Sequence, residues 1–256
     1  MPPRPHARPS PTHFLCIPLV TPASRPQLSK SLAAFKADVT SQDSFAIPVD
    51  AVRPLGTLHL TLGVMSFPNN EGVGKAIEVL KALKPRDILA SIKPLSSVTR
   101  LAAPAQASNA SNAPPLSSLN ITLRGLHCMK SGPKADPSKA SVLYAPPAYS
   151  EGIFQTFCEK IRTVFEEAEV MGQDDRGLLL HATVVNTIYV KGARGKKGSK
   201  LTIDATDILE RYEDYVWIED MPVEKIAICR MGAKKIEDAD DQEYEVEAEI
   251  DFCAQR

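Results

Sequence analysis

TLHLTLGVM (57–65) and GLLLHATVVNTIYV (177–190) are the two stretches of this sequence that decide its fold. In both, apolar residues alternate with polar ones, which is typical of a β-strand that buries one face. The first stretch places on its apolar face Leu58, Leu60, Leu62 and Val64. The second places there Leu180, Ala182 and Val184. The polar faces then carry a repeated pair, His59 with Thr61 beside Gly63, and His181 with Thr183.

The repeated His-x-Thr pair has a direct chemical use. Residues i and i+2 of a strand project the same way, so each pair brings an imidazole and a hydroxyl to one small volume. Two facing pairs can surround a phosphate, with one histidine as base, the other as acid, and both hydroxyls as donors to its oxygens. This chemistry needs no metal. A single histidine or threonine on a strand is commonly structural, so it is the repetition that favours a site.

The rest of the sequence predicts an α+β protein. Helices are expected at 25–39 with Ser24 as N-cap, from 73 to a stop at Pro85, at 151–171 with a stop at Gly172, and at 204–212. Further strands are expected at 13–20, 119–126, 141–145, 223–231 and 242–252, the last with an acidic face toward water. This order predicts two pseudo-symmetric lobes, each an antiparallel sheet with packed helices, around a central cleft.

Two segments fall outside the predicted folded part. Residues 1–12 are rich in proline and poor in apolar side chains, which predicts a disordered tail. The stretch AAPAQASNASNAPPLSS (102–118) has the composition of a disordered insertion in a surface loop. We therefore expect one two-lobed domain over residues 13–254, interrupted by that insertion.

Composition limits the partners and the compartment. Lys plus Arg number 30 and Asp plus Glu 31, so there is no global basic field for tight binding of nucleic acid, and any such contact must be local, for example through the basic loop 191–200. The five cysteines are scattered, which argues against a disulfide framework and a zinc site. The apolar run 14–20 is too short to span a bilayer. We expect a protein of the cytoplasm, the nucleus or both, with no membrane partner.

The two motifs, HLTL (59–62) and HATV (181–184), resemble those of the two-histidine phosphoesterase superfamily, which includes RNA 2′,3′-cyclic phosphodiesterases and 2′-5′ RNA ligases. THF (12–14), LRGL (123–126) and the closing strands also resemble the phosphoesterase domain shared by an A-kinase anchoring protein and the activating signal cointegrator complex subunit 1. The chain departs from many relatives at Leu180, where they have proline. Nothing outside the domain resembles a kinase-anchoring helix.

The resemblance implies a metal-independent phosphodiesterase, acting without a cofactor on 2′,3′-cyclic or 2′-5′ phosphodiesters of nucleotides or RNA ends. His59, Thr61, His181 and Thr183 are the implied catalytic residues, and Phe14 is a candidate for substrate binding by stacking, although a core phenylalanine is the simpler interpretation. The alternatives are a nucleotide- or RNA-binding module of low activity in a transcription-coactivator or repair complex, and a protein-binding scaffold. We expect a monomer with a nucleotide or RNA phosphate as ligand.

Overall fold

The computed structural model describes residues 10–92, 119–129, 136–148, 152–173, 176–192, 201–237 and 239–252. The predicted insertion at 102–118, most of the predicted tail and most of the basic loop lie outside these residues. Within them, Thr12 is already part of the structure, because its backbone N–H donates to Met65 and its carbonyl accepts from Met231.

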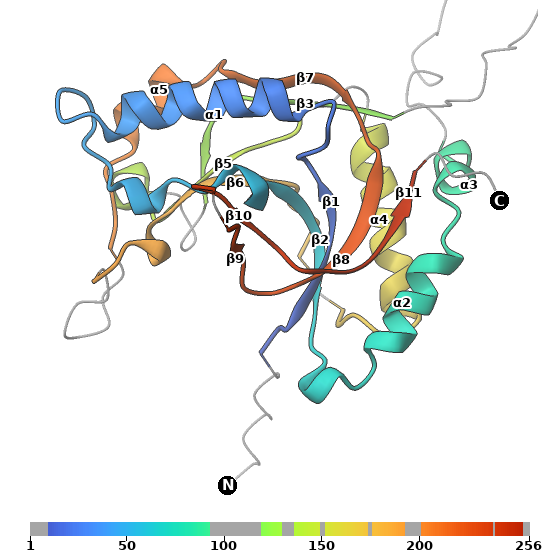
Figure 1. Cartoon of the computed structure of the whole chain (residues 1–256). Helices are drawn as coiled ribbons and strands as arrows, with labels where there is room; N and C mark the ends of the chain where they lie inside the picture. The colour runs from blue at the N-terminus through green and yellow to red at the C-terminus, as the bar shows by residue number, and fades with distance from the viewer. Residues whose placement is uncertain are drawn as a thin grey trace, which may run out of the picture.

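The described residues form short strands and helices in mixed order (Figure 1). The strands are β1 (His13–Pro18), β2 (His59–Met65), β3 (Asn120–Arg124), β4 (His127–Cys128), β5 (Val142–Ala145), β6 (Ala182–Asn186), β7 (Val216–Pro222), β8 (Lys225–Arg230), β9 (Lys234–Lys235), β10 (Gln242–Glu243) and β11 (Val246–Asp251). The helices are α1 (Arg25–Thr40), α2 (Val73–Ala82), α3 (Pro85–Ala90), α4 (Ile153–Glu167) and α5 (Thr206–Arg211). Among the 3₁₀ turns, three bear on the site: η1 (Val49–Ala51), η2 (Leu55–Thr57) and η6 (Thr187–Tyr189).

The largest sheet has the order β11-β8-β1-β2, and all of its neighbours are antiparallel. The smaller sheets, β3-β7 and β4-β5-β6, are antiparallel as well. Backbone hydrogen bonds from Arg124 to Pro146 and from Ala148 to Thr122 join β3 to the chain that leaves β5, so these two sheets form one layer. The predicted α+β class with antiparallel sheets is confirmed.

The helices divide between the two layers (Figure 1). The helix α1 lies along β7, whereas α2 contacts β8 and β11 and α4 contacts β2. Each long helix packs on a strand that is not its neighbour in sequence. The helix α1 follows β1 but packs on β7, and α4 follows β5 but packs on β2. The lobes are therefore not consecutive halves of the chain, and the large sheet takes strands from both ends of it.

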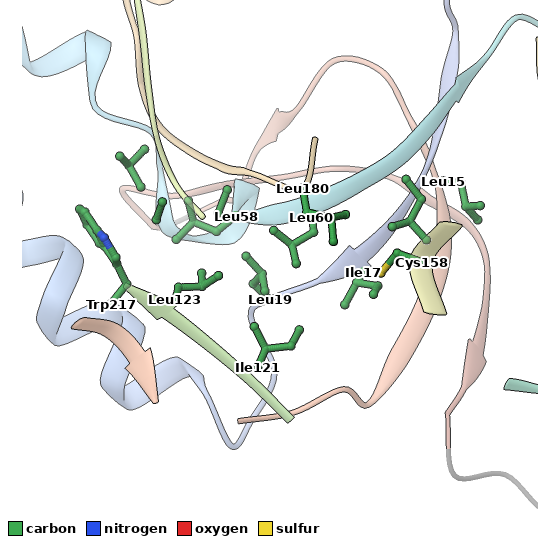
Figure 2. Close-up of a cluster of buried hydrophobic side chains, with 14 of the residues drawn as sticks. Leu15, Ile17, Leu19, Leu58, Leu60, Ile121, Leu123, Cys158, Leu180 and Trp217 are labelled. Carbon is green, nitrogen blue, oxygen red and sulfur yellow. The ribbon is translucent and has the colours of Figure 1, made fainter. Parts of the chain in front are cut away.

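A single large core fills the space between the layers. Figure 2 shows Leu58, Leu60 and Leu180 in one cluster with Leu15 and Ile17. Each of these side chains is almost completely buried, and burial of a leucine stabilises a fold by about 1.5–3 kcal/mol. The residues that flank His59 and His181 therefore point into one shared core, as the alternating pattern predicts.

A register shift changes the outward face of β2 at its far end. The β1–β2 ladder slips between Leu15 and Cys16, which places a bulge in the middle of the pair. Beyond it Val64 is 45% exposed, and Gly63 packs against the buried Met171, whose Sδ would lie 2.2 Å from an added Cβ. The predicted faces of Val64 and Gly63 are therefore wrong.

Three helix ends differ from prediction. Ser24 is the N-cap residue of α1, as predicted, but its side chain makes no capping hydrogen bond, because its hydroxyl donates to the carbonyl of Leu19 at 2.5 Å. Pro85 is the first residue of α3, where its missing N–H costs nothing. The helix α4 ends before Gly172, and the chain turns at Glu169, which has φ 57°.

Three strand predictions also need correction. The stretch 177–190 is a strand only over β6, so His181 lies directly before it. The sequence pattern missed β7, where Trp217 and Ile218 are adjacent and both buried, so no alternation is visible. The final strand is divided into β10 and β11, and Val246 is 48% exposed. Its acidic side chains pair with basic neighbours rather than only with water, namely Glu245 with Lys234, Glu247 with Arg230 and Glu249 with Lys225.

Gly56 lets the turn η2 approach the chain at β10. An added Cβ would lie 2.5 Å from the carbonyl oxygen of Gln242, and the Gly56 N–H donates to Asp241 Oδ1 at 2.9 Å. The contact fixes the segment that leads into Tyr244 beside the turn that leads into His59.

We expect Gly56→Ala to lower the free energy of unfolding by about 1–3 kcal/mol, because the clash is with backbone and cannot be relieved by a rotamer change. Gly74→Ala in α2 is the matched control: an added Cβ there meets nothing within 4 Å, so we expect a gain of up to about 1 kcal/mol. Urea unfolding of both proteins checks this. Equal midpoints for Gly56→Ala and wild type would contradict it.

Candidate active site

The first His–Thr pair lies on β2 and is fixed by its own backbone. The Nδ1 of His59 is 2.8 Å from the carbonyl oxygen of Thr57, and its Nε2 is 3.1 Å from Oγ1 of Thr61. A carbonyl oxygen only accepts, so Nδ1 carries the proton and donates it. In the neutral ring Nε2 is then the acceptor, and the Thr61 hydroxyl donates to it. The Nε2 lone pair, which can take up a proton, therefore faces the Thr61 hydroxyl.

The second pair repeats this arrangement. The Nδ1 of His181 is 2.8 Å from the carbonyl oxygen of Leu179, which leaves Nε2 as the acceptor of the neutral ring. Thr183 follows on the same face of the chain, and both residues are partly exposed. Tyr144 on β5 lies opposite Thr183, and its ring centroid is 5.5 Å from that of His181. The same hydrogen bond, from a histidine Nδ1 to the carbonyl oxygen two residues earlier, thus occurs at both motifs.

The two pairs lie close together because β2 and β6 are in contact. Between them, the backbone N–H of Arg53 donates to the Val184 carbonyl at 2.9 Å, and Val52 forms a β-bridge with Val185. A charge on His181 lowers the pKa of His59, so the two imidazoles share one electrostatic environment. The structure therefore brings the predicted residues together, and we call them the histidine site: His59, Thr61, His181 and Thr183.

The pKa of His59 is lowered from the ordinary 6.5 to about 4. Burial is the largest cause, because it disfavours the charged ring. The hydrogen bond to the Thr57 carbonyl opposes this, whereas the positive charges of His181 and Arg53 add to it. His59 is therefore neutral at neutral pH. Its contribution to stability is complete above pH 6.5 and is lost as the pH falls toward 4, because only the unfolded chain takes up the proton readily in that range.

Aromatic rings enclose His59 on two sides. Its ring centroid is 4.7 Å from that of Phe14 and 5.3 Å from that of Tyr244, which meets it edge-on. Phe14 is only 3% exposed and packs with Cys16 and Cys229 in a small cluster of its own. Phe14 thus supports the imidazole from behind, and stacking of a substrate base on it stays a prediction.

Two residues near the site, Arg53 and Tyr189, belong to neither His-x-Thr motif. Arg53 is 5% exposed, and its Cζ lies 3.6 Å from the centroid of the Tyr189 ring. A signal for Arg53 exists: it is a lone cation in the otherwise mostly apolar stretch from Ile47 to Leu60. Tyr244, which lies in the predicted last strand at 242–252, contacts the ring of His59.

The other described histidines lie outside the site. His13 is 1% exposed at the far end of β1, where its ring bonds with the Thr12 hydroxyl at 2.8 Å and approaches Glu247 at 3.5 Å. His127 stacks on Tyr144 at 5.7 Å between centroids. In the part of the chain that the structure describes, no three His, Cys, Asp or Glu side chains are grouped to hold a metal ion. No helix over these residues has the length and apolar character needed to cross a membrane.

Comparison with known proteins shows the family of this chain. The family model of the AKAP7 2'5' RNA ligase-like domain matches residues 11–252. The chain belongs to this family. The resemblance inferred from the two His-x-Thr motifs is thereby confirmed, and the AKAP7 2'5' RNA ligase-like domain takes in both of them.

Individual relatives of this AKAP7-like domain are distant. A Schizosaccharomyces pombe protein, C15D4.13c, is 24% identical over 216 residues, which are 84% of this chain and 86% of that protein. The crystal structure of E. coli LigT complexed with 3'-AMP is 14% identical, with a TM-score of 0.47 over 95% of this chain and 99% of that one. Kluyveromyces marxianus Usb1 with uridine monophosphate is 12% identical, with a TM-score of 0.38 over 84% of this chain and 92% of that one.

We expect His181→Ala to raise the pKa of His59 above its value of about 4, because a neighbouring positive charge that disfavours the imidazolium is removed. The pKa should stay below 6.5, since burial is the larger cause and remains. An NMR titration of the His59 ring carbon-bound protons in both proteins measures this. The control is His127→Ala, which leaves both imidazoles of the histidine site in place. An unchanged His59 titration in His181→Ala would show that the two rings do not share one site.

Proposed function

We propose that this chain is a metal-independent phosphodiesterase that hydrolyses 2′,3′-cyclic or 2′-5′ phosphodiesters of nucleotides or RNA ends. The proposal rests on one hydrogen bond that occurs at both motifs. Both histidines hold Nδ1 on the carbonyl two residues earlier, at 2.8 Å in each case, which leaves both Nε2 atoms for the ligand. A purely structural role for these histidines would not explain why the same hydrogen bond occurs at both motifs. Membership in the AKAP7 2'5' RNA ligase-like family supports the phosphodiesterase class.

The proposed reaction uses the two rings in opposite protonation states. His59, which is held neutral, accepts a proton from water through Nε2 as the water oxygen attacks phosphorus. The bond between phosphorus and the leaving 2′ or 3′ oxygen breaks, and His181, protonated on Nε2, gives its proton to that oxygen. One proton enters the protein and one leaves it, so the site ends with the roles of the rings exchanged. The bound phosphate favours positive charge on both imidazoles, which raises the low basicity of His59 in the complex.

The threonines hold the phosphate in this scheme. The Thr61 hydroxyl, 3.1 Å from Nε2 of His59 in the free protein, turns to a non-bridging phosphate oxygen when the ligand binds. Thr183 acts in the same way from the other strand. Charge that develops on the phosphate oxygens is then met by the two hydroxyl donors, and no metal is required.

A second candidate function is that of a nucleotide- or RNA-end-binding module with little turnover. One observation favours it: a pKa of about 4 makes His59 a weak base in the free protein. The E. coli LigT and K. marxianus Usb1 structures carry nucleotides, which is consistent with either function for this chain.

We expect His59→Ala and His181→Ala each to lower turnover by on the order of 10²–10⁴, with a double mutant far less impaired than the product of the two effects. Thr61→Val, which keeps the shape and removes the hydroxyl, should cost roughly 10–10². Product formation from a panel of 2′,3′-cyclic nucleotides and 2′-5′ dinucleotides, with a chelator present, measures these effects.

The matched control for this assay is His127→Ala, a histidine outside the site on β4. If the wild type binds nucleoside monophosphates but forms no product on the whole panel, the binding-module function replaces the enzyme. If hydrolysis occurs but survives loss of both histidines, the histidine site is not its location.

A further inference from the structure

Arg53 is a buried cation without a compensating charge. Its side chain is 5% exposed, and its Nη2 has no hydrogen-bond partner. Among the described residues, no carboxylate lies within ion-pair distance of it. A buried charge is costly unless it is paired, so such a residue is expected where an anion completes the site.

The position of Arg53 is set from both layers of the fold. Its backbone donates to Val184, which neighbours Thr183 on β6. Its guanidinium stacks on the ring of Tyr189 in η6. From the other side it reaches Tyr244: burial raises the pKa of that phenol most, the nearby Tyr189 raises it further, and the charge and hydrogen bonding of Arg53 lower it. The guanidinium therefore lies at the junction of the two strands that carry the histidine site.

We propose that Arg53 is the positioning residue that makes the histidine site selective for anions, by placing an uncompensated positive charge beside it and by holding Tyr244 against His59. The inference rests on the proposed function in one respect, which is that the anion is the phosphate of a phosphodiester. Arg53 takes no part in proton transfer, because a guanidinium stays protonated at every pH at which the protein is folded.

Two physical effects follow from this placement. First, the charge acts through the protein interior, where it is screened much less than in water, so it attracts an anion that enters between the two His–Thr pairs. Second, Tyr244 is edge-on to His59 with 5.3 Å between ring centroids, so fixing the phenol also fixes the imidazole. The charged and titratable groups that act on His59 among the described residues are Arg53 and His181, and Tyr244 is in ring contact with it.

The experiment compares Arg53→Met, Arg53→Lys and a matched control, Arg211→Met. Arg211 also stacks on an aromatic ring, 4.5 Å from the centroid of Phe45, but it is 53% exposed and paired with Asp38. The probe is inorganic phosphate, whose binding is followed by calorimetry, and the second readout is the NMR titration of His59. Neither readout requires hydrolysis, so a failure of the proposed enzyme activity and a failure of this inference are distinguishable.

We expect Arg53→Met to weaken phosphate binding by a factor of 10 or more and to raise the pKa of His59, because a positive charge that disfavours the imidazolium is lost. Arg53→Lys should restore most of the phosphate affinity. It should not restore full turnover, because an ammonium lacks the planar fork that stacks on Tyr189 and bonds Tyr244. Arg211→Met should leave both readouts unchanged.

A folded Arg53→Met protein with wild-type phosphate affinity and an unchanged His59 titration would overturn the inference, as would a wild type that does not bind phosphate. If Arg53→Met does not fold, the wild type itself provides the test. The side-chain ¹⁵N signals of Arg53 should then shift as phosphate saturates the protein while those of Arg211 do not, and an unmoved Arg53 signal would refute the proposal.

Discussion

The shared core beneath β2 and β6 is the constraint on which the histidine site depends. Leu58, Leu60 and Leu180 are buried together, and a strand turns successive side chains to opposite faces. Burying the leucines therefore turns His59 and His181 away from the core. The geometry of the histidine site is therefore a consequence of hydrophobic packing, the dominant favourable contribution to folding. The hydrogen bond from each Nδ1 to a backbone carbonyl then fixes the orientation and the tautomer of the ring, which packing does not determine.

Electrostatics in this site are unbalanced in the free protein. Burial is the main cause that lowers the pKa of His59 and keeps the ring neutral, and the nearby guanidinium of Arg53 has no counter-charge. The unpaired guanidinium costs stability when no ligand is bound, and in the proposed site an anion between the strands supplies its missing counter-charge. The fold thus carries a locally unfavourable charge distribution that the large core offsets, which is common at functional sites.

Sequence patterns predicted the parts of this structure that depend on periodicity. The alternation around His59 and His181 identified the four residues of the histidine site, and the class of fold followed from the order of strands and helices. Features that depend on three-dimensional packing were missed. The strand β7 has adjacent buried residues, Trp217 and Ile218, and so shows no period of two. The bulge that exposes Val64 is a property of the pairing with β1. The role proposed for Arg53 depends on its contacts with Tyr189 and Tyr244, which no sequence pattern indicates.

The strand order β11-β8-β1-β2 has a consequence for biosynthesis. The strand β1 is buried on both faces, and one of its two neighbours, β8, lies far from it in sequence and is synthesised much later. Until then the nascent chain presents an apolar strand with an open edge, which is prone to aggregation and slow to find its distant partner. The large sheet cannot be completed until β8 and β11 have been translated. A chain that stops before β8 keeps both motifs but lacks two of the four strands of the sheet that carries the first.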